Sequence, residues 1–130
     1  MHPARLACTT AALGLLALSV PASAQTADPA ARGRLLFLQC RACHTLAAGE
    51  PHKVGPNLHG LFGAAAASRP GFAAYSKPLR ESGILWDEAA LDRFLAGPGR
   101  AVPGTTMAFA GLPKPEDRAA VIAYLRAATR

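Results

Sequence analysis

The chain has 130 residues, of which 51% are hydrophobic, 17% are charged and 6% are aromatic, and its formal net charge is +6. This length allows one ordinary domain and not two, and the hydrophobic share excludes a disordered or collagen-like chain. Aromatic residues are few, however, and much of the apolar content is alanine, which buries little area per residue. The composition therefore predicts a small globular domain whose core is completed by something other than its own side chains.

Residues 1–24 have the pattern of a secretory signal peptide. A positively charged start with Arg5 precedes an apolar run over residues 11–20, and residues 22–24 form an A-x-A cleavage site. The run is too short to span a bilayer, which needs about 20 apolar residues. We therefore expect cleavage after this segment and export of one soluble domain, residues 25–130, whose net charge is +5 because Arg5 is lost.

The first half of the exported domain contains one expected helix and a long connection. Asp28 is a helix-capping residue and Pro29 suits the first helical position, so a helix is predicted to start there and to lead through an apolar stretch to Cys40. Glycine and proline then punctuate residues 47–74 without any sustained periodicity. An ordered connection of this length usually wraps or binds something.

The second half contains three further expected helices. Ser76 begins a short helix that Gly83 can close, and Asp87 caps another whose end is marked by Gly97 and Pro98. Residues 99–114 are expected to be irregular. A last helix follows, with acidic residues in its first turn and Ala120, Val121, Tyr124, Leu125 and Ala128 on its inner side. No strand alternation persists, so the predicted fold class is all-α, with short helices and long loops.

The segment Cys40-Arg41-Ala42-Cys43-His44 is the C-x-x-C-H attachment motif for c-type haem. Two cysteines three positions apart at the end of a helix present their sulfurs on one side, ready to form thioethers with one porphyrin. The adjacent His44 can then bind the iron as proximal ligand. Only these two cysteines remain after loss of Cys8 with the leader, so we expect one covalent haem c.

A C-x-x-C pair has two other common uses, a redox-active disulfide and a metal site. A thioredoxin-like disulfide enzyme requires a βαβ pattern that the sequence lacks. A zinc site needs four ligands, and beyond the motif only His52 and His59 remain as nitrogen donors in the exported domain. We expect both of these histidines to be structural, with His52 no more than exposed.

The second axial position decides between two kinds of haem protein. An iron bound only by His44 would be open, as in oxygen carriers, gas sensors and peroxidases. Met107 is the single methionine of the exported domain and lies in a loop rich in proline and glycine before the last helix. A lone methionine is more often core filler, but Met/His ligation would raise the reduction potential and close the iron.

With these residues in place, the chain resembles class I cytochrome c over essentially all of residues 29–130. Beside the haem motif, the resemblance rests on Gly55–Gly63, Pro70-Gly71-Phe72, Tyr75, Gly83-Ile84, Trp86, Pro103-Gly104-Thr105, Phe109-Ala110-Gly111 and residues 122–125. It implies the cytochrome c fold, in which short helices and long loops wrap one covalently bound haem.

The resemblance also implies roles for single residues. It places Met107 beside His44 as an axial ligand, and it lets the carbonyl of Pro56 accept a hydrogen bond from the His44 imidazole. It packs Gly33 against Tyr124. The positions that hydrogen-bond the haem propionates correspond to Tyr75, Trp86 and Thr105.

The chain departs from the family pattern around the haem. Alanine at position 64 replaces a frequent arginine, which removes a positive partner for a propionate, and Thr106 replaces a lysine beside the axial methionine. Phe94 and Leu79 replace a tyrosine and an asparagine of the distal side, and the segment between Phe37 and Cys40 is one residue shorter. We expect a drier methionine side, which raises the potential, and a lowering effect from the charge lost at Ala64.

The expected function is transfer of single electrons in the periplasm by a monomer that is not an enzyme. The implied partners are a membrane quinol–cytochrome c reductase and a terminal oxidase, or another periplasmic redox protein. Their acidic surfaces would meet basic residues near the haem crevice, for which the candidates are Arg41, Lys53, Arg100 and Lys114. Nucleic acid is not expected, because no basic stripe is interleaved with aromatics. The alternatives are a dedicated electron-transfer subunit of a periplasmic dehydrogenase and a haem peroxidase or gas sensor with an open iron.

Overall fold

The computed structural model describes residues 28–130, so the predicted signal peptide lies outside the described residues. Within that range no extended strand forms, and one isolated antiparallel bridge joins Ala65 to Leu85. The all-α prediction is therefore confirmed. No helix of residues 28–130 has the length and apolar character needed to cross a membrane. In chain order the elements are α1 (Pro29–Leu36), the 3-10 helix η1 (Phe37–Gln39), α2 (Lys77–Arg80), α3 (Glu88–Ala96), α4 (Pro98–Ala101) and α5 (Pro115–Ala128).

Three helices begin at the capping side chains that the sequence predicts. Asp28 accepts a hydrogen bond from the amide two residues on at 2.9 Å, Ser76 from the amide three residues on at 3.3 Å, and Asp87 likewise at 2.7 Å. Each bond satisfies an amide that has no partner inside its helix. Helix α5 has no such side-chain cap. It carries two acidic residues in its first turn, whose negative charges interact favourably with the positive end of the helix dipole.

The region after α3 differs from the prediction. The helix ends at Gly97 as expected, but Pro98–Ala101 forms α4 where the sequence predicts an irregular stretch. Proline has the backbone angle of a first helical residue, so Pro98 ends one helix and starts a new turn, closed by the Val102 amide on its carbonyl at 2.8 Å. Helix α2 ends at Arg80, before Gly83, the residue that the sequence predicts to close it.

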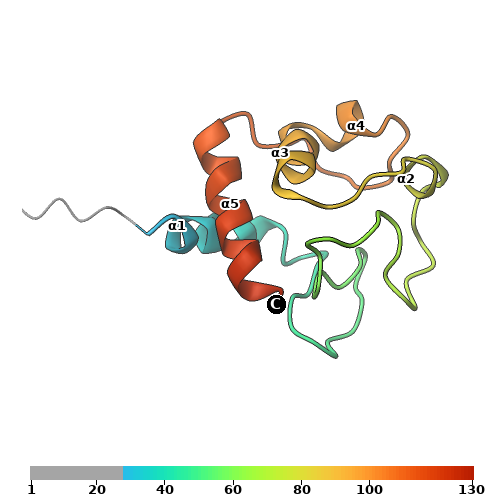
Figure 1. Ribbon diagram of the computed structural model, residues 1–130, viewed down its shortest axis with the longest axis horizontal. Coiled ribbons are helices and arrows are strands. Elements are labelled where there is room, and N and C mark those ends of the chain that lie inside the picture. Colours follow the sequence, from blue (N-terminus) through green and yellow to red (C-terminus); the bar gives the residue numbers. More distant parts are fainter. Residues whose placement is uncertain (1–27) are drawn as a thin grey trace, which may run out of the picture.

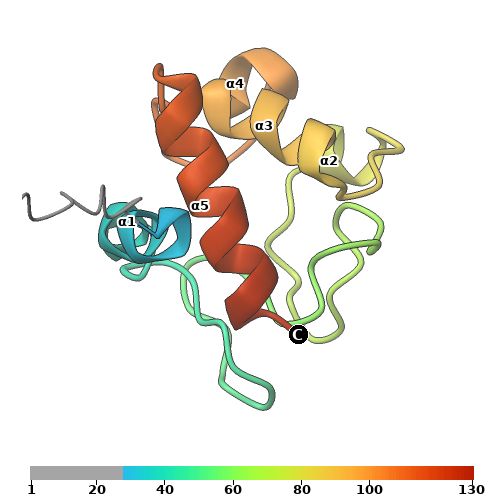
Figure 2. The ribbon, with the colours of Figure 1, turned by 60° about the vertical axis from the view of Figure 1, so that its left-hand side comes forward.

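Helices α1 and α5 cross near the N-terminal end of the described chain (Figure 1), and the turned view shows α5 running past α1 (Figure 2). Gly33 makes the crossing possible, because a Cβ built there would lie 1.9 Å from the carbonyl oxygen of Ala120 and 2.8 Å from the Cβ of Tyr124. The contact of Gly33 with Tyr124 that the family resemblance implies is therefore present. An ion pair between Arg32 and Asp117 joins the same two helices.

The core lies where α3 and α5 pack together, with α4 beside α3 (Figure 1). Phe37 is only 1% exposed and stacks at a tilt on Tyr124, with ring centroids 5.5 Å apart. Most of the remaining chain between η1 and α2 is loop, as the glycines and prolines predict. The buried core is formed by Phe37, Trp86, Ala90, Leu91, Phe94, Leu95, Val102, Leu112, Val121, Ile122 and Leu125.

Candidate functional site

The loops and helices enclose a cavity of about 480 Å³. This volume falls within the usual range of cofactor sites, about 300–1,000 Å³. Apolar side chains from α3, α5 and the connecting loops form most of its wall. The structure brings every predicted site residue to this cavity: Cys40, Cys43, His44, Pro56, Tyr75, Trp86, Thr105 and Met107.

The two cysteines lie on one helical turn. The amides of Cys43 and His44 both donate to the carbonyl of Cys40, at 3.0 and 2.9 Å. Cys40 and Cys43 form no disulfide with each other, and burial, followed by the charge of Cys43, raises the pKa of the Cys40 thiol. Redox-active C-x-x-C pairs typically have a cysteine of lowered pKa, so the raised pKa of Cys40 gives no support to thiol–disulfide exchange. It is placed to react with one group inside the cavity.

The imidazole of His44 is fixed by a hydrogen bond and by close contact with a glycine. Its Nδ1 lies 2.7 Å from the carbonyl oxygen of Pro56, which accepts the hydrogen bond that the resemblance implies. The ring rests on Gly55, where an added Cβ would lie 2.4 Å from the ring carbon Cε1. Burial lowers the pKa of His44, and the bond to Pro56 partly opposes this. The imidazole is therefore neutral, with Nε2 left as the electron-pair donor.

His52 has a larger structural role than an exposed histidine. The ring is half-buried, and its Nδ1 accepts a hydrogen bond from the Asn57 amide at 3.0 Å. Its Nε2 donates to the carbonyl of Pro70 at 2.9 Å, and the ring meets Phe72 edge to face at 5.5 Å. His52 thus ties the loop that carries Pro56 to the loop of residues 69–72. The expectation that it is structural stands, but it is not merely exposed.

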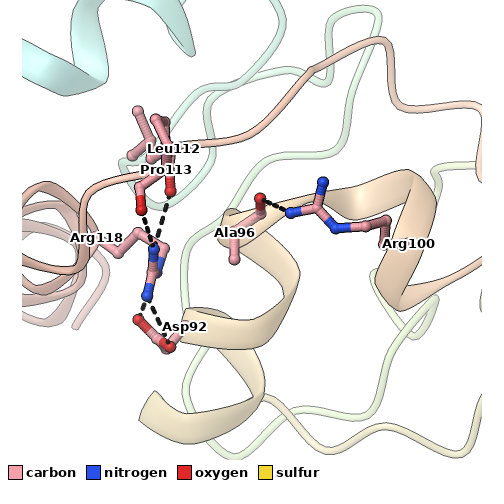
Figure 3. A network of polar contacts seen from close by, with 6 residues as sticks. All are labelled: Asp92, Ala96, Arg100, Leu112, Pro113 and Arg118. Carbon is pink, nitrogen blue, oxygen red and sulfur yellow. Dashed lines mark hydrogen bonds and ion pairs between the residues drawn. The ribbon is translucent and has the colours of Figure 1, made fainter.

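The loop that carries Met107 is clamped by Arg118, a residue that the sequence analysis did not single out. Its guanidinium donates to Asp92 on α3 at 2.7 Å and to the carbonyls of Leu112 and Pro113, each at 3.0 Å (Figure 3). The Arg118 side chain is only 12% exposed. Because the clamp joins α3, the loop and α5, it limits how far the half-buried Met107 can move. Only the tertiary contacts show this role.

A second wall of the cavity is aromatic. Trp86 is buried and meets Phe94 edge to face at 5.0 Å, and Tyr75 meets Phe72 in the same way at 4.8 Å. Ala64 lines the cavity and carries no charge. Arg69 also lines it and is positively charged, although the sequence analysis did not single it out. Its position directly before the Pro70-Gly71-Phe72 segment is the signal that could have drawn attention to it.

The residues of the cavity fit a covalently bound haem. Two thiols one turn apart, a neutral imidazole fixed at Nδ1 and an apolar lining suit the macrocycle and its iron. By contrast, within residues 28–130 no group of three or more histidine, cysteine, aspartate or glutamate side chains is arranged to hold a metal ion, so the zinc alternative gains no support.

The fold and the cavity thus define a small helical haem c protein, and comparisons with known proteins agree. Residues 30–129 match the family model described as cytochrome c. The chain is 46% identical to cytochrome c2 of Rhodomicrobium vannielii over 109 residues, covering 84% of this chain and 86% of that one. It is 48% identical to cytochrome c of Chlamydomonas reinhardtii over 100 residues, covering 76% and 88%.

Among solved structures, cytochrome cH from Methylobacterium extorquens matches with a TM-score of 0.70 and 42% identity, covering 75% of this chain and 97% of that one. The chain belongs to the cytochrome c family, as a class I member with the cytochrome c fold. It is a monohaem electron carrier with one covalent haem c, and not an enzyme.

Proposed function

We propose that the protein carries single electrons between redox proteins of the periplasm through an iron bound by His44 and Met107, with Cys40 and Cys43 as the thioether attachments. One observation carries the proposal: an imidazole nitrogen donor and the only methionine of residues 28–130 line the same cavity as the two thiols. Both side chains are half-buried, and each lies on a loop held by tertiary hydrogen bonds.

The protein residues prepare the site in three ways. The Pro56 carbonyl holds Nδ1–H of His44 and leaves the Nε2 electron pair for the metal. Phe94 and Leu79 line the cavity with apolar groups and keep water away. Haem c, when bound, would supply the one-electron iron couple, and Met107 is the residue whose sulfur would close the iron to small exogenous ligands.

We propose that Tyr75, Trp86 and Thr105 hydrogen-bond the propionates. All three line the cavity, and each has a hydroxyl or indole N–H that can donate. Burial raises the pKa of Tyr75, which keeps its phenol protonated and able to donate at neutral pH.

The proposed location and partners follow from charge and from the leader pattern. Cleavage after residue 24 would release a periplasmic monomer with a net charge of +5. Lys53 donates to the carbonyl of Arg41 at 2.7 Å, so two exposed basic residues lie together beside the haem motif. We propose that this pair meets acidic surfaces on a quinol–cytochrome c reductase and a terminal oxidase of a respiratory chain, or on another periplasmic redox protein.

The other two basic candidates are placed differently. Arg100 donates to the carbonyl of Ala96 at 2.6 Å at the end of α3 (Figure 3), and Lys114 is exposed just before α5. None of the four candidates lines the cavity, but Arg41 and Lys53 are direct chain neighbours of the cavity-lining residues Cys40 and Val54, whereas Arg100 and Lys114 have no such neighbour. We therefore propose Arg41 and Lys53 as the principal docking charges.

Absorption spectra of the purified holoprotein test the ligation. We expect a sharp α band when it is reduced, a weak iron–sulfur band at the red end of the visible range when it is oxidised, and no prompt carbon monoxide binding at neutral pH. Prompt carbon monoxide binding would instead indicate an open iron. Isolation in a stable complex with a dehydrogenase would indicate a dedicated subunit rather than a shuttle.

A further inference from the structure

Within residues 28–130, Arg69 is a half-buried cation without an acidic partner. Its only side-chain hydrogen bond within residues 28–130 runs from Nε–H to the carbonyl oxygen of Asn57, at 3.2 Å. A guanidinium has five N–H donors, so those of the two terminal nitrogens remain available. Within the same residues, the basic members of the ion pairs are other side chains, namely Arg32, Lys77, Arg118 and Arg126.

The guanidinium lies at the cavity wall that Tyr75 helps to form. Arg69 lines the same cavity as the cysteine pair and His44. A Cβ added to Gly60 would lie 3.8 Å from its terminal nitrogen Nη2. The backbone amide and the charge of Arg69 both act on the Tyr75 phenol, where they partly oppose the effect of burial on its pKa. The charge therefore faces the aromatic side of the cavity.

Burying a charge in such a place is unfavourable unless an opposite charge meets it. Haem c brings two propionate carboxylates into this protein, and a carboxylate is the group that an arginine fork binds best. We propose that Arg69 pairs with a haem propionate and is its counter-charge. The inference rests on the haem c in this cavity and concerns this chain's own cation.

This pairing alters the expectation drawn from position 64. Alanine there removes a positive charge, which alone would lower the reduction potential. Arg69 supplies a charge to the same cavity from another segment of the loop. The net charge around the propionates is then retained.

The test compares the reduction potentials of Arg69→Gln and Arg80→Gln holoproteins with that of the wild type. Arg80 is exposed, bonds to the Ala73 carbonyl and does not line the cavity, so its loss removes the same charge from the surface. At a fixed poised potential, we expect the ratio of reduced to oxidised protein to fall about threefold to tenfold in Arg69→Gln. In Arg80→Gln we expect less than about a twofold change, because solvent screens an exposed charge.

A purely structural role through Asn57 would lower the potential in another way, by loosening the loop, so two further readouts are needed. In Arg69→Gln the propionate pKa rises, and the potential should fall more steeply with increasing pH than in the wild type. The other titratable groups near this wall are Tyr75 and His59, which line the cavity, and His52, which bonds to Pro70 beside it. All three are present in both proteins, and loss of the Arg69 charge moves the pKa of Tyr75 upward, further from neutral pH. The double variant Ala64→Arg/Arg69→Gln should regain the wild-type potential, because it returns a guanidinium to the cavity wall.

An unchanged potential and pH profile in Arg69→Gln would overturn the proposal, as would a double variant that stays as low as Arg69→Gln. If Arg69→Gln does not accumulate as holoprotein, the double variant decides, with a wild-type potential in support and a lowered one against. The haem content and ligation of the wild type are determined separately from its absorption spectrum. A wild type without covalent haem would refute the proposed function. A wild type that contains haem but whose reduction potential does not depend on Arg69 would refute only this pairing.

Discussion

Phe94 is a single residue through which the environment of the methionine side can be tested. It is buried, lines the cavity and packs edge to face on Trp86. An apolar wall disfavours the extra positive charge of ferric iron, which raises the reduction potential. The departure from tyrosine at this position therefore has a measurable consequence.

We predict that Phe94→Tyr lowers the reduction potential and shifts the pH at which the alkaline form loses methionine ligation. At a fixed poised potential the reduced-to-oxidised ratio should fall about threefold, since a hydroxyl dipole stabilises the ferric charge. The intensity of the iron–sulfur absorption band, recorded as the pH is raised, measures this loss of methionine ligation. Phe62→Tyr is the control, because Phe62 lies under Arg126, 4.4 Å from ring centroid to Cζ, and does not line the cavity. Equal behaviour of the two variants would count against a dry methionine side.

The crossing of α1 and α5 leads to a prediction at the scale of elements. Gly33→Ala places a Cβ against the backbone of Ala120, which cannot move without shifting α5. We expect the free energy of unfolding to fall by about 3 kcal/mol or more, measured by denaturant titration of the holoprotein.

Gly99→Ala is the matched control for this substitution. A Cβ at Gly99 meets nothing within 4 Å, and the residue lies in helix α4, where alanine is favoured. Its unfolding free energy should stay within about 1 kcal/mol of the wild type. A similar fall in the free energy of unfolding in both variants would show that the helix crossing is not the reason why position 33 requires glycine.

The clamp on the methionine loop leads to a second prediction at this scale. Arg118→Lys removes the fork that joins Asp92 to the carbonyls of Leu112 and Pro113 (Figure 3), and lysine cannot replace four directed bonds. We expect a loss of about 1–3 kcal/mol in stability and loss of the iron–sulfur band at a lower temperature than in the wild type.

Arg93→Lys serves as the control for the clamp. Arg93 is exposed on the same helix as Asp92, so this exchange should leave both the stability and the band unchanged within error. If Arg118→Lys unfolds like Arg93→Lys and keeps its band on heating, the loop does not depend on the clamp.

At the scale of the whole molecule, local signals were the ones that the sequence could predict. Asp28, Ser76 and Asp87 cap the expected helices because a cap bonds only to its own next residues. The sequence also predicts the cavity-lining cysteines and histidine, because these residues lie on one turn of the chain.

The contacts that were missed join segments far apart in the chain. His52 reaches Pro70, Arg118 reaches α3, and Arg69 reaches Asn57, and none of these pairs has a characteristic spacing. Helix α4 was missed because Pro98 both stops one helix and starts the next. Such features depend on how the loops fold over the cavity, which a linear pattern does not encode.

The positive net charge leads to a prediction about association. Electron transfer to an acidic partner should slow about tenfold when the ionic strength rises from about 0.01 M to about 0.15 M, because salt screens the attraction that guides docking. Lys53→Gln should weaken this dependence more than Arg93→Gln, an equal charge loss on α3. Stopped-flow rates measure both, and a rate insensitive to salt would exclude electrostatic docking.

The central claim is an iron closed by His44 and Met107 in a one-electron carrier. The electron paramagnetic resonance spectrum of the oxidised holoprotein at neutral pH tests it most directly, because spin state reports whether both axial positions are filled by strong ligands. We predict low-spin ferric signals alone. A predominantly high-spin spectrum would contradict the claim and indicate an open iron.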